Sequence, residues 1–277
     1  MKLFMRPTKF VLVVAGLVSG VVSLSAENRT TWEQLPDLSV NGVDILATFN
    51  AGTVKPTRNV VLADQFKSTD NGPITGLRFW GSWLNNVSDP NVKFVVGIQA
   101  NNVSGTGGIG YERPGALLWT TTLTGGSSPY ATTPQQMFWN PSTPAVIPGD
   151  NTQTLKYDFV NPLGTIGAAS GVAFQQVAGT TYWLSIQAVT TGGQLFGWST
   201  RDWLAGHSGV SAVYGTNSSV GSTRITFKDM LYPAGVDPSM VGQPIDLAFA
   251  LDTPEPTTTA VLVVGLVALL WRRKSVA

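Results

Sequence analysis

Residues Val92–Ala100 read VKFVVGIQA, and this stretch decides the fold class. Every second side chain from Val92 onward is apolar, whereas the other face carries Lys93 and Gln99. Because successive side chains of a strand point to opposite faces, the pattern predicts a strand with one face in a core. The same alternation appears in four more segments, Leu155–Val160, Tyr182–Val189, Thr223–Lys228 and Asp246–Asp252.

Short apolar runs bounded by turn residues indicate further strands. Gly125-Gly126 and Pro148-Gly149-Asp150 are two of the turn signals that separate them. Helical periodicity is nearly missing between the two ends of the chain, so we predict an all-β fold, a β-sandwich of the jelly-roll type. The additional predicted strands are Val43–Thr48, Val60–Phe66, Gly76–Leu84, Leu117–Thr122, Gly171–Val177 and Gln194–Ser199.

Long polar segments interrupt the strand pattern. Asn101–Gly115 is rich in Gly and Asn, whereas Thr124–Gln136 and Asn140–Thr154 are rich in Pro, Ser and Thr. We predict loops in all three. They offer a boundary between two halves, but no internal repeat supports a division, and we favour one continuous domain over residues 27–252.

The N-terminal end has the three parts of a secretory signal peptide. Three positive charges lie within the first nine residues, the last of them at Lys9. The apolar run Phe10–Val22 follows, and small residues surround Ser25 and Ala26. The apolar run is shorter than the roughly 20 residues that span a bilayer, which argues against a permanent anchor. We predict a signal peptide over residues 1–26, cut between Ser25 and Glu27.

The C-terminal end places a motif, a short apolar helix and a basic cluster in that order. The motif Pro254-Glu255-Pro256 precedes the apolar stretch Ala260–Trp271, which the basic residues Arg272, Arg273 and Lys274 follow. At about 1.5 Å per residue, the apolar stretch reaches about 18 Å of a roughly 30 Å hydrocarbon core. This suits a temporary transmembrane helix, with the basic cluster on the cytoplasmic side.

This tail, residues 253–277, resembles the PEP-CTERM sorting signal of Gram-negative bacteria. The resemblance implies recognition and cleavage near the motif by an exosortase, a transpeptidase-like membrane enzyme. It also implies transient contact with the inner membrane, then secretion to the cell surface or the extracellular matrix. Proteins with such tails occur in bacteria that make exopolysaccharide. An ordinary C-terminal anchor is the alternative interpretation, and it too places the body outside the cytoplasm.

Several phrases of the body resemble an uncharacterised domain of secreted, surface-sorted proteins from planctomycete-like bacteria. The resemblance would cover most of residues 30–252, and it implies no activity. The phrases are Trp32-Glu33-Gln34-Leu35-Pro36-Asp37, Asn41-Gly42-Val43-Asp44, Ala63-Asp64-Gln65-Phe66, Gly72-Pro73-Ile74-Thr75, Phe79-Trp80-Gly81-Ser82-Trp83 and Pro244-Ile245-Asp246-Leu247-Ala248-Phe249.

Composition excludes several classes of function. The formal net charge is +1, but six of the 17 basic residues lie in the two terminal segments. The remaining 11 face 16 acidic residues, so the body carries about −5 and offers no basic face to nucleic acid. Cysteine is absent, which excludes disulfides, thiolate metal sites and cysteine nucleophiles.

No catalytic constellation emerges from the sequence. Residues 105–110 fit the G-x-G-x-x-G pattern, but no helix follows to bind phosphate. His207 is the single histidine, and Ser208 beside it would point to the opposite face of a strand. A glycosidase needs two carboxylates across a cleft, and the spacing of the candidate carboxylates does not indicate such a pair. We therefore predict that the protein is not an enzyme. The carboxylates considered were Asp64, Asp70, Asp202 and Glu112.

Metal and cofactor sites are also not apparent. One histidine without cysteine cannot form a usual zinc site, and no cofactor motif is present. Asp64–Asp70 and Asn85–Asn91 are rich in oxygen ligands, although neither matches a calcium loop. A structural calcium is therefore a hypothesis that rests on ligand type alone.

Tryptophan is the most suggestive side chain in the body. Sugar rings have apolar faces that can lie against an exposed aromatic ring. Trp83, Trp198 and Trp203 are candidate glycan contacts, because a polar loop lies beside the last two and Trp80 and Trp83 face opposite ways. The alternative is that these rings fill the core of the sandwich.

Three hypotheses follow. The first is a non-catalytic surface or matrix protein that associates with exopolysaccharide. The second is a secreted hydrolase acting on polysaccharide, and the third is a purely structural surface module.

Overall fold

A computed structural model of the chain describes residues 28–50, 59–103, 111–144, 146–160, 173–207, 209–222 and 225–255. The predicted signal helix and the predicted C-terminal transmembrane helix lie outside these residues. Within them, no helix is both long and apolar enough to cross a membrane.

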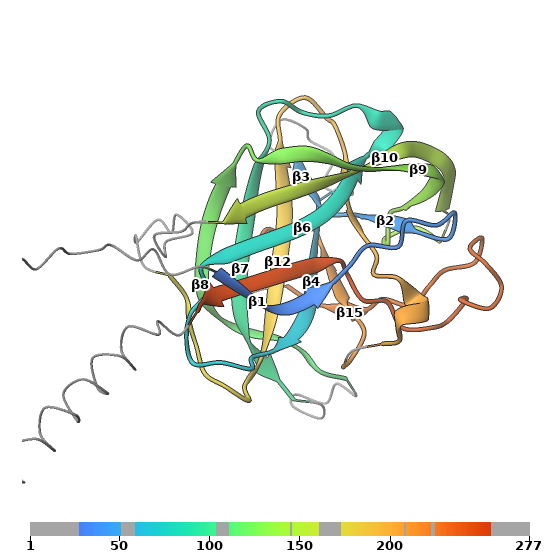
Figure 1. Cartoon of the computed structure of the whole chain (residues 1–277). Helices are drawn as coiled ribbons and strands as arrows, with labels where there is room; N and C mark the ends of the chain where they lie inside the picture. Colours follow the sequence, from blue (N-terminus) through green and yellow to red (C-terminus); the bar gives the residue numbers. More distant parts are fainter. Residues whose placement is uncertain are drawn as a thin grey trace, which may run out of the picture.

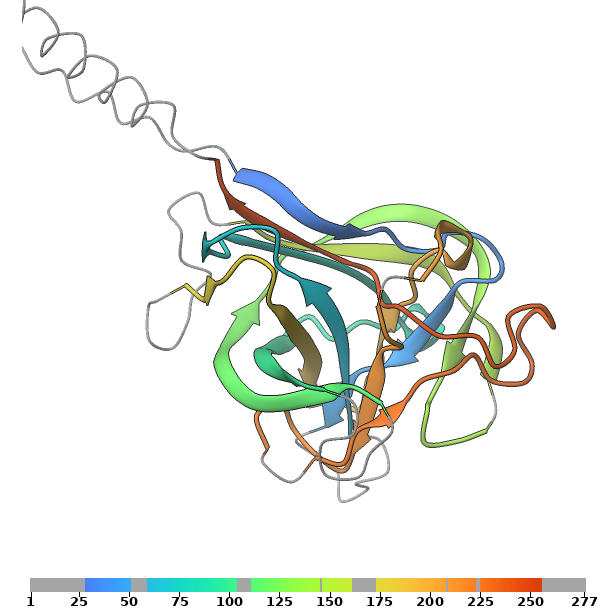
Figure 2. The same cartoon turned by 90° about the horizontal axis from the view of Figure 1, so that it is seen from below.

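Two large sheets make up the body, as Figures 1 and 2 show. The first sheet contains, in spatial order, β1 (Asn28–Gln34), β16 (Phe249–Pro254), β6 (Gly76–Trp83), β10 (Val146–Val160), β9 (Ser127–Trp139), β2 (Val43–Leu46) and β13 (Phe196–Ser199). Because β13 also pairs with β6, five of these strands close on themselves: β6, β10, β9, β2 and β13.

The second sheet runs across the first in Figure 1. Its order is β15 (Lys228–Asp229), β14 (Val213–Thr216), β4 (Val60–Lys67), β12 (Thr181–Thr190), β7 (Lys93–Asn102) and β8 (Arg113–Thr124), with β3 (Thr48–Asn50) also paired to β12. The short strands β5 (Gly72–Pro73) and β11 (Gln175–Gln176) pair separately, and two single 3₁₀ turns are η2 (Leu84–Asn86) and η4 (Trp203–Ala205). The all-β prediction is confirmed, and the layers are those of a β-sandwich; the jelly-roll topology stays a prediction.

One apolar core joins the two sheets. Phe94, Val96 and Ile98 of β7 lie in it, which confirms the alternation in the opening stretch of the sequence. Tyr182 and Leu184 of β12 share this core, whereas Trp183 packs on the other face. The core is rich in edge-to-face aromatic pairs, for example Phe94 with Tyr157 and Phe94 with Phe196.

The chain passes repeatedly from one sheet to the other, and two of these crossings are very short. At Ala47, between β2 and β3, the backbone N–H donates to Phe196 in one sheet and the carbonyl accepts from Ala188 in the other. At Gly125-Gly126, between β8 and β9, both residues have positive φ angles of 74° and 86°. Glycine adopts this left-handed conformation without a steric penalty, which explains the sharp change of sheet.

Two predicted loops are strands. Thr124–Gln136 and Asn140–Thr154 fall largely within β9 and β10, which pair with each other over their length. Their polar composition has a physical reason: much of β9 is exposed on its outward side, so Ser, Thr and Gln serve there. The pairing also breaks register near Pro148-Gly149, and such bulges accommodate residues that disrupt a regular ladder. The third predicted loop is strand at both ends, and residues 104–110 lie outside the described part.

The core also contains a polar cluster between β2, β6, β10 and β13. Asp44 is fully buried, and its carboxylate accepts hydrogen bonds from Ser82 at 2.7 Å, Ser199 at 2.6 Å and Asn151 at 2.9 Å. Burial raises the pKa of Asp44 to about 6, against the effect of these hydrogen bonds. Burial likewise raises the pKa of Asp150 to about 7, although its hydrogen bond from Asn151 acts the other way.

We predict that this cluster makes the protein less stable as the pH rises. In the unfolded chain both carboxyls lose their protons near pH 4, whereas in the folded chain they do so near pH 6 and 7. Between these values the folded state binds more protons, so the free energy of unfolding falls by about 1.4 kcal/mol per pH unit for each carboxyl.

The measurement is denaturant unfolding from pH 4 to pH 8 in EDTA. Asp44→Asn should flatten the slope by roughly the share of one carboxyl, and the control Asp70→Asn, at a more exposed aspartate, should leave the slope unchanged. A slope that Asp44→Asn does not alter would contradict the prediction.

Candidate functional site

The segment that follows β13 is fixed on both sides by backbone hydrogen bonds. Thr200 donates its N–H to Val43 at 2.9 Å, and Arg201 donates to Asp246 at 2.8 Å. Asp202 donates to Leu35 at 3.3 Å. The segment is therefore held between the end of β1 and the approach to β16.

The turn η4 comes next and presents Trp203. The Asp202 side chain accepts from the Leu204 N–H at 3.0 Å, the usual role of an N-cap residue. Gly206, with a positive φ of 82°, ends the turn by donating its N–H to Trp203 at 3.1 Å. A residue with a side chain would be strained at Gly206, so the glycine fixes the direction in which the chain continues to His207.

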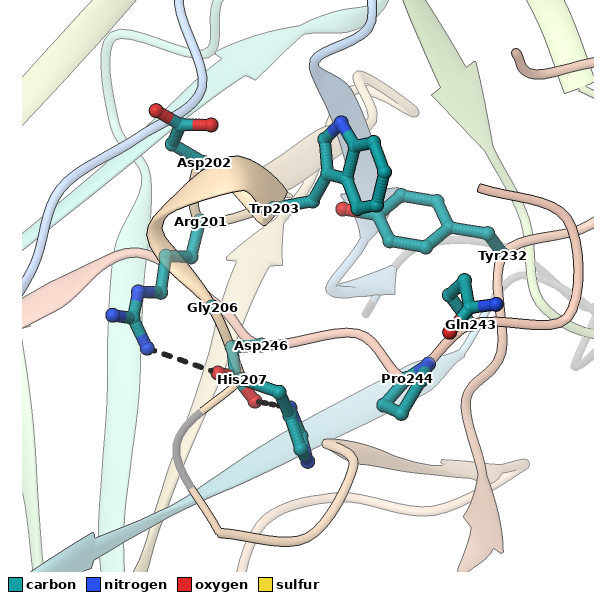
Figure 3. A pocket seen from close by; sticks show the side chains of 9 residues that line it. All are labelled: Arg201, Asp202, Trp203, Gly206, His207, Tyr232, Gln243, Pro244 and Asp246. Atoms are coloured by element: carbon teal, nitrogen blue, oxygen red, sulfur yellow. Dashed lines mark hydrogen bonds and ion pairs between the residues drawn. The ribbon is translucent and has the colours of Figure 1, made fainter. Parts of the chain in front are cut away.

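Asp246 contacts two basic side chains of the site. In Figure 3 the side chains of Arg201 and His207 both point toward Asp246. Arg201 Nη1 lies 3.2 Å from one carboxylate oxygen, and His207 Nδ1 lies 2.7 Å from the other. The Asp246 side chain is only 3% exposed, so this ion pair is buried on its acidic side.

A second carboxyl group, Asp64, lies behind Asp246. It is fully buried and accepts hydrogen bonds from the N–H groups of Leu247 and Gln65, each at 2.7 Å. Burial, and next the charge of Asp246, raise the pKa of Asp64 well above its usual value, although both backbone bonds and Arg201 act in the opposite direction. Burial and the neighbouring Asp246 therefore both oppose the ionisation of Asp64.

These groups border a pocket of about 160 Å³. Trp203, which is half-buried, supplies aromatic surface to its wall, whereas Tyr232 borders the pocket with only 2% of its surface exposed; Gln243 and Pro244 complete the wall (Figure 3). Tyr232 is held by a hydrogen bond from its N–H to Gln243 at 3.0 Å and by a side-chain hydrogen bond with Thr200. The pocket thus combines aromatic surface with an arginine, a histidine and a carboxylate.

A larger, shallower hollow of about 590 Å³ adjoins the pocket and shares Arg201, Asp202 and Trp203 with it. Its other wall is the connection between β1 and β2, residues 35–41. Leu35 and Leu204 expose 47% and 78% of their surface there. Trp203 therefore separates a polar pocket from an apolar surface.

The structure corrects two of the three predicted glycan contacts. Trp83 is 3% exposed and donates its indole N–H to Tyr157 at 2.9 Å in the core. Trp198 has no exposed surface and donates to the Ala248 carbonyl at 2.8 Å. Neither ring can meet a sugar, because both are closed between the sheets. Trp203 is half-buried and stays a candidate.

The predicted opposition of Trp80 and Trp83 is correct, but neither ring is exposed. Trp80 packs in a separate cluster with Ala248 and Ala250, and Tyr130 covers it edge to face. Tyr130 belongs to β9, a strand that sequence reasoning assigned to a loop, and its ring covers Trp80 on the outer face of β6.

The carboxylates considered for hydrolysis are engaged elsewhere. Asp70 pairs with Arg29 at 2.8 Å, and Glu112 accepts from Gln65 and Asn101 at 2.6 and 2.8 Å. Within the described residues, no three His, Cys, Asp or Glu side chains converge as a metal site. Both the glycine pattern at 105–110 and Ser208 lie outside the described residues.

Sequence reasoning missed Asp246, Tyr232 and Gln243. It had singled out His207 and the polar segment at Arg201-Asp202, but their partner lies about 40 residues further along the chain. The only signal for Asp246 was its place in one of the sequence segments that resemble the uncharacterised domain.

The sorting motif begins where the body ends. Strands β1 and β16 are antiparallel, and Asn28 lies opposite Pro254. Asp252 secures this end of the pair by accepting from Thr30 at 2.8 Å and from Arg78. The first and last parts of the described chain therefore leave the body side by side, as Figure 2 shows.

Comparison with known families matches the body to one family model and the C-terminal tail to another. A family model described as "Domain of unknown function (DUF7901)" matches residues 30–252. The chain belongs to the DUF7901 family. The PEP-CTERM protein-sorting motif matches residues 252–274, which supports a secreted, surface-directed substrate of exosortase. No curated protein and no solved structure matches the chain. The planctomycete-like source stays a prediction.

We predict that Asp246 stabilises the DUF7901 domain through its buried pairs. Asp246→Asn leaves Arg201 and His207 without their anion, and losing one partner of a buried pair costs about 3 kcal/mol. The exposed pair Arg29–Asp70 is the matched control, since Asp70→Asn should cost less than about 1 kcal/mol. Equal losses in urea unfolding of the two variants would show that the Asp246 pairs are energetically unimportant.

Proposed function

We propose that this secreted, exosortase-sorted protein is a non-catalytic surface or matrix protein that binds exopolysaccharide in the Trp203 pocket. The observation that carries the proposal is the combination of aromatic surface with fixed polar groups. Trp203 and Tyr232 line the same small pocket as Arg201, His207 and Asp246.

The chemistry of this pocket suits a sugar. The apolar face of a sugar ring can lie against an indole ring, which buries a large area and loses little side-chain freedom. Hydroxyl groups at the ring edge need donors and acceptors in fixed positions, and Arg201, His207 and Gln243 offer them. The volume of about 160 Å³ is below the roughly 300 Å³ of sites for drug-sized ligands, which favours one sugar unit with the chain continuing over the adjoining hollow.

A hydrolase is the second candidate, because His207 and Asp246 form the histidine–carboxylate pair that base catalysis uses. However, both oxygens of Asp246 are engaged and Asp202 caps η4, so neither is a second, open carboxylate across the pocket. Among the described residues that line the pocket, none is a Ser, Thr or Cys that could act as nucleophile. Binding without cleavage is the simpler function, and a purely structural module is the remaining alternative.

We expect the purified exported protein to bind one or more polymers in a panel of bacterial exopolysaccharides. Trp203→Ala should weaken that binding about tenfold or more, since one stacked aromatic ring contributes on the order of 1–2 kcal/mol. Tyr130→Ala, at a distant half-exposed ring, is the matched control and should bind normally.

Reducing ends are counted in the same mixtures. Their release, abolished by His207→Ala, would favour the hydrolase. If no polymer binds and Trp203→Ala only lowers stability, the structural module is favoured.

The sorting function has its own test. The mass of the exported protein should correspond to cuts near Ala26 and near the Pro254-Glu255-Pro256 motif. Deleting the motif should leave the C-terminal tail attached. Replacing Arg272, Arg273 and Lys274 by Gln should impair retention in the membrane before cleavage. Unchanged processing after deletion of the motif would contradict the exosortase interpretation.

A further inference from the structure

Asp44 and Asp150 are buried without a cationic partner. The groups that act on the two carboxyls are hydroxyls, an amide, backbone N–H groups and, for Asp150, the charge of Asp44. None of these groups in the described structure is a Lys, Arg or His. A buried carboxylate without a counter-charge is costly, so such a pair must hold either protons or a cation.

The amide of Asn151 lies between the two carboxyls. Its Nδ2 is 2.9 Å from an oxygen of Asp44 and 3.0 Å from an oxygen of Asp150. Ser82 and Ser199 approach Asp44 from the other strands, at 2.7 and 2.6 Å. These hydrogen bonds therefore join five oxygen-bearing side chains into one buried cluster.

Two oxygens of this cluster lack a hydrogen-bond partner. They are Oδ2 of Asp150 and Oδ1 of Asn151, in residues that are 6% and 1% exposed. Buried polar atoms nearly always have a partner, so unsatisfied oxygens indicate a bound species. A half-turn of the Asn151 amide would exchange its nitrogen and oxygen and aim Oδ1 at both carboxylates.

The turn η2 lies next to the cluster. Asn85 and Asn86 of η2 both have a φ of 57°, the left-handed conformation that asparagine tolerates better than most residues. The Asn85 backbone N–H bonds to Asp150, and the Asn86 side chain accepts from Thr152 at 3.4 Å. These contacts place η2 against β10 beside the cluster.

We propose that Asp44, Asp150 and Asn151 bind a calcium ion. The two carboxylates match its charge, and carboxylate, amide and hydroxyl oxygens are the ligands that calcium prefers. Zinc would require nitrogen or sulfur ligands, which the cluster does not offer. Magnesium keeps several of its waters, and a site this enclosed leaves little room for them. The proposal does not depend on polysaccharide binding.

The test is thermal unfolding of the purified exported protein in EDTA, in 10 mM CaCl₂ and in 10 mM MgCl₂. With a dissociation constant on the order of 10⁻⁴ M, as in extracellular calcium modules, CaCl₂ should raise the midpoint by about 5 °C or more. MgCl₂ should raise it less. Equilibrium dialysis with ⁴⁵Ca²⁺ should give one bound ion per chain.

Asp150→Asn should abolish both the shift and the bound ion. Asp158→Asn is the matched control, because Asp158 lies on the same strand, is one-third exposed and pairs with Lys156. If Asp150→Asn does not fold, the dialysis of the unaltered protein still decides the question. No bound calcium would overturn the proposal and leave two carboxyls that hold protons, and calcium retained by Asp150→Asn would place the ion elsewhere.

Discussion

The position of β16 constrains the rest of the structure. This last strand of the body pairs with β1 on one side and β6 on the other, so the first sheet is incomplete until residues 249–254 are in place. The segment that leads into β16 carries Asp246 to Arg201 and His207, and places Leu247 N–H against Asp64. The same strand ends at the sorting motif. One short element thus links the core, the candidate pocket and the site of processing.

Four of the buried aspartates form two groups that the structure treats differently. Burial and the charge of Asp246 oppose the ionisation of Asp64 and raise its pKa, while Asp246 itself is met by Arg201 and His207. Asp44 and Asp150 have no such cations nearby. The difference separates a site that is satisfied by protein side chains from one that needs something from solvent, either protons or a metal ion. Conditions outside the cell, where pH and calcium vary, therefore act on the second cluster far more than on the first.

Strands with one apolar face could be predicted from the sequence, as β7, β12 and β16 show, because burial imposes the alternation directly. Strand β9 and the first part of β10, residues 146–154, could not, since polar side chains predominate there and their prolines lie in or near breaks in register. The end of β10, Leu155–Val160, was predicted and pairs with β6. The same limit explains why the burial of the tryptophans could not be predicted. A ring on a strand is core or surface according to what covers it, and Trp80 is covered by β9, which sequence reasoning did not recognise as a strand. The sorting motif at the C-terminal end was predictable because it is a linear signal, and the family model matches it at residues 252–274; the signal peptide stays a prediction.

Candidate sites were less predictable, because both are assembled from distant segments. Asp44 and Asp150 stand more than 100 residues apart, and the pairings of β2 with β9 and of β9 with β10 bring them within reach of one amide. The placement of the pocket nevertheless agrees with a surface role. Strand β16 spans six residues, or about 20 Å, between the Asp246 segment and Pro254. In Figure 1 the orange η4 turn accordingly lies at the opposite end from the two chain ends. The pocket and the start of the sorting motif at Pro254 therefore lie at opposite ends of β16.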